Sequence, residues 1–333
     1  MGAAWKPDFL GDGYRFLTLE LGEDDEGPVT ATLVAHTPEP PTVPAHAVLY
    51  LHGWTDYFFQ TELAEFWSGL GAAFYALDLR KYGRSLRPGQ TPGYITSLQE
   101  YDADIEAAIS ALTEHLRSGR GADAPVRLSI MAHSTGGLIA SLWAHRNPGR
   151  IEALILNSPW LELRGSWIVR YAAAGLLEPL ARLRPKARLK VPELTNYWRS
   201  ISREADGEWD LQPGMRPPSS WPVRAGWIKA VLTGHAQVAR GLDIRVPVLL
   251  MASATSTVAV SWTEAMKTSD SVLDVNLMVQ RGLLLGPEVT VFRFADALHD
   301  VLLSALPVRR RVYGKLEQWS RAFVLQPQKG VQA

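Results

Sequence analysis

Six consecutive residues, Ala132-His133-Ser134-Thr135-Gly136-Gly137, constrain this chain more than any other segment. An apolar run at 126–131 precedes them, and a run with helical patterning at 138–143 follows. A strand that turns sharply into a helix exposes a serine Oγ at the turn, and it needs small residues two positions before and after that serine. Ala132 and Gly136 occupy those positions. The pattern therefore predicts a nucleophile elbow with Ser134 at its apex.

The alternative interpretation is a serine N-cap beside a glycine pair that lets a strand and a helix pack closely. A second motif upstream favours catalysis. The run 47–51 has the pattern of a buried strand and ends in His52-Gly53-Trp54. In a serine hydrolase with a nucleophile elbow, one oxyanion donor is the amide after the nucleophile and another lies in such an upstream loop. We therefore expect the backbone N–H groups of Trp54 and Thr135 to form an oxyanion hole.

A general base is expected near the C-terminus, after the last strand. The run 289–294 has the composition of a compact strand, and His299 follows it. Of the eight histidines, only His299 lies just beyond a predicted strand and downstream of the other motifs. An imidazole at that position can reach over the carboxyl edge of a parallel sheet toward Ser134. His299 is therefore the predicted base.

The acid is the hardest residue to assign. The predicted strand 246–252 should carry it, yet no carboxylate follows until Glu264, so 253–269 has the character of an insertion. We assign Asp270, with Asp274 as the alternative because it suits the N-cap of a helix through residue 283. Glu264 is a third candidate. With Asp270 the chain order is serine, aspartate, histidine, which is the order of the α/β-hydrolases.

The remaining patterning predicts an α/β fold with a mostly parallel sheet flanked by helices. Two runs, 14–21 and 29–36, predict an opening hairpin that turns at Gly27-Pro28. Further predicted strands then alternate with helical stretches such as 98–116, as expected for a parallel sheet. The interval 160–241 interrupts this rhythm and holds six of the twelve tryptophans. We expect a helical cap at 160–241, inserted between two parts of the core at 1–159 and 242–333.

Composition excludes several other classes of protein. Lysine plus arginine and aspartate plus glutamate each number 34, and a net charge of zero gives no basis for binding nucleic acid. The chain has no cysteine, which excludes disulfides and thiol catalysis.

The chain shows neither a signal-peptide pattern nor an apolar run long enough to span a membrane, so we expect a cytoplasmic location. A basic run at 182–190 suits a solvated helix face, or a lid that contacts a lipid surface.

A further motif runs from Asp78 to Ser85. Together with the others it resembles the α/β-hydrolases of the monoacylglycerol lipase and serine aminopeptidase type, which are also described as lysophospholipase-like. The resemblance covers residues 14–322, and in the Asp-x-Arg-Gly-x-Gly-x-Ser signature Lys81 replaces the first glycine. The segments that carry it are Leu51-His52-Gly53, Ala76-Leu77-Asp78-Leu79-Arg80-Lys81-Tyr82-Gly83-Arg84-Ser85, the hexapeptide 132–137, Asp270-Ser271-Val272 and Leu298-His299-Asp300-Val301-Leu302.

These features predict a serine hydrolase that cleaves carboxylic esters of small molecules through an acyl-enzyme. No metal or organic cofactor is expected, because the chain offers no cluster with metal-ligand spacing. Trp160 and Trp167 are predicted to line the substrate pocket, although tryptophans of a cap can equally serve only to pack it. Two alternatives stay open: an amide or peptide hydrolase of the aminopeptidase branch, and a binding protein with inactive machinery on a hydrolase fold.

Overall fold

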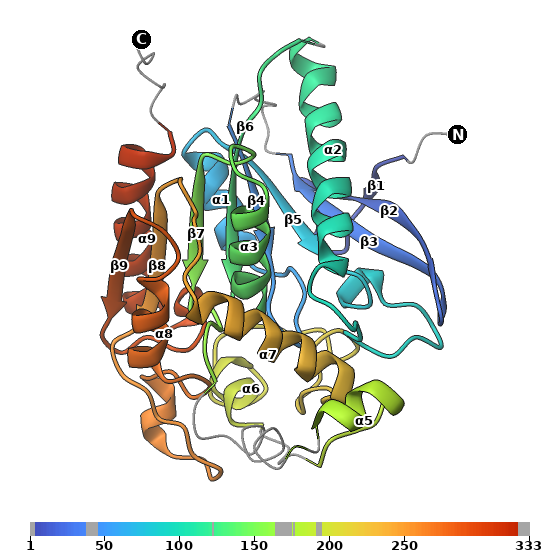
Figure 1. Cartoon of the computed structure of the whole chain (residues 1–333). Helices are drawn as coiled ribbons and strands as arrows, with labels where there is room; N and C mark the ends of the chain where they lie inside the picture. Colours follow the sequence, from blue (N-terminus) through green and yellow to red (C-terminus); the bar gives the residue numbers. More distant parts are fainter. Residues whose placement is uncertain are drawn as a thin grey trace.

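The computed structural model describes residues 4–37, 46–121, 123–163, 175, 177–190 and 195–325 (Figure 1). Within these residues, nine strands form one sheet in the order β1-β2-β3-β5-β4-β6-β7-β8-β9. The strands are β1 Lys6–Pro7, β2 Tyr14–Asp24, β3 Gly27–His36, β4 His46–Leu51, β5 Ala73–Asp78, β6 Arg127–His133, β7 Ala153–Asn157, β8 Val248–Ser253 and β9 Val289–Phe294.

The sheet is antiparallel from β1 to β5 and parallel from β5 to β9. The predicted α/β-hydrolase architecture, a mostly parallel sheet flanked by helices, is thus confirmed. The carboxyl ends of the parallel strands lie together at one edge, the lower edge in Figure 1. In open α/β sheets, ligands bind in the crevice outside this edge.

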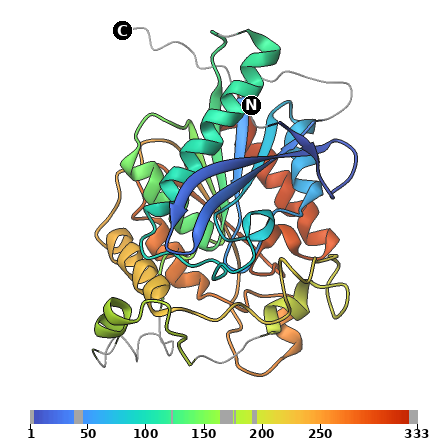
Figure 2. The ribbon, with the colours of Figure 1, turned by 90° about the vertical axis from the view of Figure 1, so that its right-hand side faces the viewer.

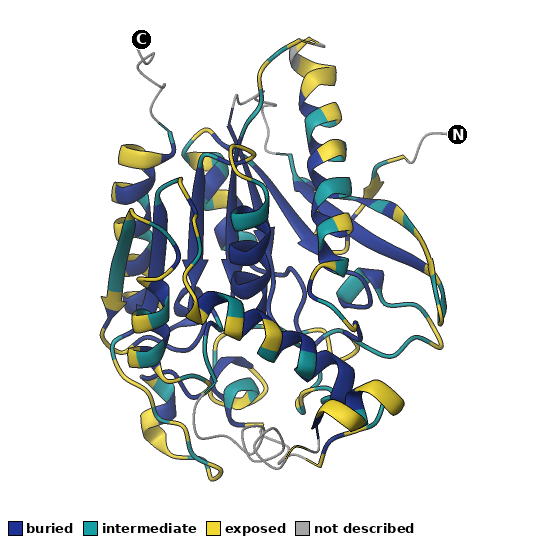
Figure 3. Cartoon of the chain, in the orientation of Figure 1, coloured by how far each residue is buried: buried dark blue, intermediate teal, exposed yellow. Residues whose placement is uncertain are grey.

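Helices cover both faces of the sheet. In Figure 2 the sheet is seen along its edge, with the β2–β3 hairpin crossing the front. One face packs against α2, α3, α7 and α8, and the opposite face against α1 and α9. Figure 3 shows the central parallel strands buried between these layers, whereas the edge strand β9 is only half-buried. The helices are α1 Thr61–Gly69, α2 Glu100–Arg120, α3 Thr135–Arg146, α5 Leu177–Leu183, α6 Asn196–Ile201, α7 Ala225–Ala239, α8 Val275–Gly282 and α9 Leu306–Phe323.

The opening hairpin is confirmed, but its predicted turn at Gly27-Pro28 is wrong. Gly27 is already paired with Asp24 across the two strands, so the turn lies two residues earlier. The carboxylate of Asp24 accepts a hydrogen bond of 2.8 Å from the Glu26 N–H, which stabilises this tighter turn. Pro28 is compatible with its place near the start of β3, where proline is tolerated in a strand.

Residues 158–247 connect β7 to β8, and we call them the β7–β8 connection. Its described part contains α5, α6 and α7 and, apart from isolated bridges, no strand. These helices lie beyond the carboxyl ends of the parallel strands, below the sheet in Figure 1. The connection therefore lies beside the edge at which the elbow turns.

Candidate active site

Ser134 lies at the turn between β6 and α3. Its φ of 51° and ψ of −117° place a non-glycine residue in a backbone region that is sparsely populated. The Ser134 N–H donates to the Asn157 carbonyl at 3.1 Å, which ties the turn to the end of β7. A strained serine held between a strand and a helix has the backbone geometry of a nucleophile elbow.

Gly136 shows why the turn needs a small residue after the serine. A Cβ atom at this position would lie 2.3 Å from the His52 carbonyl oxygen and 2.9 Å from that of Leu51. Both atoms belong to the backbone, so neither can move without displacing the end of β4. The predicted requirement for glycine two positions after Ser134 therefore has a steric cause.

We expect Gly136→Ala to destabilise the protein by about 3 kcal/mol, because overpacking against a rigid backbone is costly. Gly314→Ala is the matched control, since a Cβ at Gly314, within α9, would meet no atom within 4 Å. That control should gain stability by about 0.5–1 kcal/mol, as glycine weakens a helix interior. Urea unfolding of both variants measures the difference. Equal stability of the two variants would contradict the steric explanation.

Two residues distant in sequence form a hydrogen-bonded chain with Ser134. His299 Nε2 lies 3.1 Å from Ser134 Oγ, and His299 Nδ1 lies 2.8 Å from an Asp270 carboxylate oxygen. All three residues are buried, with Asp270 fully enclosed. The second Asp270 oxygen accepts hydrogen bonds from the N–H groups of Val272 and Leu273, each at 2.8 Å. The carboxylate is therefore held in one orientation, with one oxygen left for the imidazole.

The other two candidate acids lie elsewhere. Asp274 accepts hydrogen bonds from the N–H groups of Asn276 and Leu277, so it caps α8. Glu264 is exposed and pairs with Lys267 at 3.0 Å. Neither side chain contacts His299 in the structure.

The segment 254–269 explains why the acid is so far from β8 in sequence. The chain leaves the sheet after β8 and then returns, so that Asp270 forms an isolated parallel bridge with Ser256. The Asp270 N–H donates to the Thr255 carbonyl at 2.9 Å, and the Thr257 N–H donates to the Asp270 carbonyl at 2.8 Å. Asp270 therefore lies beside the chain just past the end of β8, although the sequence separates the two by a long excursion.

The two predicted oxyanion donors belong to two segments that adjoin Ser134. Thr135 is the first residue of α3, and the loop after β4 approaches Ser134 so closely that a Cβ at Gly53 would lie 3.1 Å from Ser134 Cβ. Within the described chain, neither the Trp54 N–H nor the Thr135 N–H donates to a protein acceptor. Both amides therefore remain free to donate to another group.

The segment Asp78–Ser85 connects neighbouring loops through its side chains. Asp78 accepts from the Phe58 N–H at 2.8 Å and pairs with Arg84 at 2.8 Å, which joins the loops after β4 and β5. Lys81 occupies the position at which the family signature has glycine, and its φ of 61° is one that glycine adopts easily. Its buried ammonium pairs with Glu26 at 2.7 Å.

Comparison with known proteins identifies the family. Residues 42–266, more than half of the chain, match the model of the family described as serine aminopeptidase, S33. The chain belongs to this family. The match ends before Asp270 and His299, so these two positions rest on the geometry described above.

Solved structures resemble this S33 protein along most of its length. A soluble variant of monoglyceride lipase from Saccharomyces cerevisiae, in complex with a substrate analog, is 15% identical, with a TM-score of 0.62 and coverage of 98% of this chain and 95% of that one. A carboxyl esterase from Bacillus coagulans in complex with glycerol is 12% identical, with a TM-score of 0.62 and coverage of 92% and 98%. At such low identity these similarities establish the fold.

A curated relative matches a shorter stretch. The 1-acylglycerol-3-phosphate O-acyltransferase ABHD5 of Homo sapiens is 30% identical over 86 residues, which are 26% of this chain and 22% of the relative. The S33 protein therefore spans about a fifth of the length of the curated relatives it matches.

Trp160 lies beside Ser134, whereas Trp167 falls outside the described residues. The backbone N–H of Trp160 donates to the Ser134 carbonyl at 2.9 Å. Trp160 is half-buried, and its indole packs against that of Trp227 of α7 at a centroid distance of 5.9 Å. On the same helix, His235 Nε2 donates to the Trp160 carbonyl at 2.9 Å. Trp160 thus joins the β7–β8 connection to the elbow.

His235 makes this junction sensitive to pH. Burial lowers the pKa of its imidazole from 6.5 to about 4, and its Nδ1 has no partner within the described residues. The unfolded chain therefore takes up a proton here below about pH 6.5, whereas the native protein does not until about pH 4. Stability conferred by the neutral imidazole is fully present above pH 6.5 and declines as the pH falls through this window.

We expect His235→Phe to reduce the loss of stability between pH 7 and pH 5 by about 2 kcal/mol, because phenylalanine cannot take up a proton. The free energy of unfolding, measured by urea titration of both proteins at the two pH values, gives this difference. The same loss in the variant and the parent would show that His235 does not cause it.

Other features of the described chain lie away from this site. No helix in it combines the length and apolar composition needed to cross a membrane. No group of three or more histidine and acidic side chains in it is arranged to hold a metal ion.

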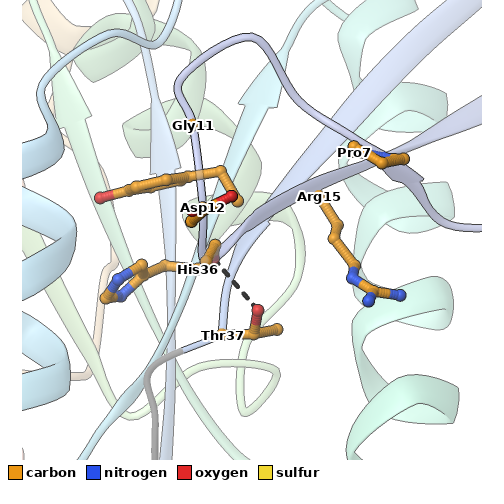
Figure 4. A pocket seen from close by; sticks show the side chains of 8 residues that line it. Pro7, Gly11, Asp12, Arg15, His36 and Thr37 are labelled. Carbon is orange, nitrogen blue, oxygen red and sulfur yellow. Dashed lines mark hydrogen bonds between the residues drawn. The ribbon is translucent and has the colours of Figure 1, made fainter.

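A cavity of about 570 Å³ lies where β2 begins and β3 ends, between residues such as Asp12, Arg15 and His36 (Figure 4). His36 pairs with Phe74 at the start of β5, so this cavity lies at the amino edge of the sheet, opposite Ser134.

Proposed function

We propose that this protein is a serine hydrolase that cleaves carboxylic esters through an acyl-enzyme. The observation that carries the proposal is the continuous hydrogen-bonded chain from Asp270 through His299 to Ser134, at 2.8 and 3.1 Å. A nucleophile within reach of a base, itself oriented by a third group, is the arrangement that activates a serine.

The reaction begins when Ser134 Oγ attacks the ester carbonyl and His299 Nε2 takes its proton. The imidazolium then donates that proton to the departing alcohol, and a water molecule hydrolyses the acyl-enzyme by the same route. Asp270 keeps the proton on Nδ1, so that Nε2 faces Ser134 as the acceptor, and it stabilises the imidazolium. The Trp54 and Thr135 N–H groups bind the oxyanion of each tetrahedral intermediate.

The same apparatus can cleave an amide, as the name of the family indicates. We favour the ester because the similar structures include a monoglyceride lipase and a carboxyl esterase. A series of p-nitrophenyl esters from acetate to palmitate, run beside a p-nitroanilide with the same acyl group, tests this choice. Turnover of the esters with little turnover of the anilide supports an esterase. Faster hydrolysis of the anilide would place the protein in the aminopeptidase branch, and no turnover of any of them would favour the binding-protein alternative.

We also propose that residues 160–241 act as a cap over a core formed by 1–159 and 242–333, and that Trp160 forms part of the acyl pocket. Trp160 is half-buried, and its backbone N–H donates to the Ser134 carbonyl, so its side chain begins next to the nucleophile. Trp167 is proposed for the same pocket from the sequence alone.

We expect Trp160→Ala to lower kcat/KM for long-chain esters by about tenfold and to change it little for the acetate, because remote acyl contacts contribute only when the acyl chain reaches them. Trp262→Ala is the control, since Trp262 packs under Arg199 at 4.2 Å and does not contact Ser134. Equal losses on acetate and long-chain esters in Trp160→Ala would mean that Trp160 serves packing alone.

A further inference from the structure

Three consecutive residues of the loop after β4 are each held by the β7–β8 connection. We call residues 53–56 the oxyanion loop, because they include the proposed donor Trp54. We call Arg216, Trp221 and Trp227 the clamp. Arg216 contacts Asp56 through an ion pair. The Trp221 backbone donates a hydrogen bond to Thr55, and the indoles of Trp227 and Trp221 pack against that of Trp54.

The first contact is a buried ion pair. Arg216 donates to an Asp56 carboxylate oxygen at 2.6 Å, and the two residues are 5% and 1% exposed. Burial opposes the charge on the guanidinium, but Asp56, Tyr197 and Asp300 together outweigh this and raise the pKa of Arg216. The same carboxylate oxygen accepts the Tyr57 N–H at 2.9 Å, so the ion pair also fixes the backbone beyond the loop. Removing one partner of such a pair leaves an uncompensated charge in the interior.

The second contact holds a strained residue. Thr55 has a φ of 51°, which is a genuine outlier for a β-branched side chain. The backbone N–H of Trp221 donates to Thr55 Oγ1 at 3.1 Å, and Thr55 is buried. Residues in such a conformation persist only when the surrounding structure determines them, and they cluster at functional sites. The clamp supplies one of the bonds that hold Thr55 in place.

The third contact locks the indole of Trp54. Its ring lies 3.8 Å from that of Trp227 between centroids and meets the ring of Trp221 edge-on at 6.1 Å. On another side, the backbone at Gly93 approaches so closely that a Cβ there would lie 2.8 Å from the indole. With its half-buried indole packed on these sides, Trp54 has little freedom to rotate its own backbone amide.

We infer that the clamp positions the Trp54 N–H, so that the oxyanion hole is complete only when the β7–β8 connection is docked on the core. Arg216, Trp221 and Trp227 are positioning residues and do not touch the reacting atoms. The connection thus has a second role beside shaping the acyl pocket: it holds a strained loop of the core in the conformation that binds the transition state.

Two variants loosen the clamp without touching the amide itself. Arg216→Met removes the ion pair, and Thr55→Val removes the hydroxyl while keeping the β-branched shape. We expect each to lower kcat by about 10- to 100-fold with KM changed less than about threefold, since loss of a whole oxyanion donor costs about 10²–10³ in kcat. Thr55→Ser retains the hydroxyl and should stay within about threefold of the parent.

Affinity for a trifluoromethyl ketone provides a readout that a merely structural role would not move. Its adduct with Ser134 carries an oxyanion, so its Ki should rise in proportion to the loss in kcat/KM. Glu208→Gln is the matched control: Glu208 also forms an ion pair between the connection and the core, with Arg309 at 2.6 Å, but does not contact the oxyanion loop. This variant should keep the parent's kcat and Ki.

The outcomes separate this role from the function on which it rests. Loss of kcat and of ketone affinity in Arg216→Met and Thr55→Val, but not in Thr55→Ser or Glu208→Gln, supports the clamp. Unchanged kcat and Ki in folded Thr55→Val, or an equal loss in Glu208→Gln, overturns it. If Arg216→Met does not fold, the pair Thr55→Val and Thr55→Ser decides. Full activity in Ser134→Ala would instead overturn the serine hydrolase itself.

Discussion

Ser134→Ala is expected to lower kcat for ester hydrolysis by at least about 10⁴, with the fold intact, because the members of a serine triad act as a unit. The alanine side chain fits where the serine is, since Ser134 Oγ has only the His299 contact as a side-chain hydrogen bond within the described chain. Steady-state assay of p-nitrophenyl butyrate, with enzyme concentration high enough to detect such a loss, measures the effect.

His299→Ala should cause a comparable loss, since no other described imidazole makes a hydrogen bond to Ser134. Thermal unfolding of both variants shows whether the fold survives. Ser118→Ala, a change on the exposed side of α2, is the control for handling and purity. Activity above about a tenth of the parent in folded Ser134→Ala contradicts the proposed mechanism.

Asp270→Asn is expected to lower kcat by about 10⁴ without unfolding the protein. The side-chain oxygen of asparagine can still accept the N–H groups of Val272 and Leu273, as the aspartate does at 2.8 Å. Its NH₂ group then faces His299 Nδ1 and donates to it, which places the imidazole proton on Nε2. In that tautomer Nε2 cannot accept the proton of Ser134.

Asp274→Asn is the matched control, because asparagine caps a helix about as well as aspartate does. It should change kcat and stability little, since Asp274 contacts only the first turn of α8. Rates and thermal midpoints of the two variants, measured together, separate the roles of the two carboxylates. A larger loss in Asp274→Asn than in Asp270→Asn would reverse the assignment of the acid.

The sequence predicts those parts of the fold and the site that depend on local patterning. The run before Ser134 and the glycines after it specify a strand, a tight turn and a helix, because only small residues fit that turn. The alternation of apolar strands with helices specifies a parallel sheet whose carboxyl ends meet at one edge. His299 could be chosen because it directly follows the last strand, and α8 could be placed because Asp274 caps it.

Contacts between distant segments are not predictable in this way. The sequence predicts the turn of the first hairpin at Gly27-Pro28 because that pair is typical of a turn, whereas the pairing of Gly27 with Asp24 places the turn before it. Nothing near Arg216 in the sequence indicates that it pairs with Asp56, since the partners are 160 positions apart. Asp270 could be ranked first, yet its position beside β8 depends on how the segment 254–269 returns to the sheet.

The central claim, that Ser134 is the acylated nucleophile, is tested most directly by trapping the acyl-enzyme. The protein is mixed with excess p-nitrophenyl butyrate, quenched with acid within its first turnovers, and analysed by intact and peptide mass spectrometry. We predict one butyryl group per molecule, located on the peptide that contains Ser134 and missing from Ser134→Ala. A butyryl group on another residue, or rapid turnover with no acylated protein in the parent and equal turnover in Ser134→Ala, would contradict the account.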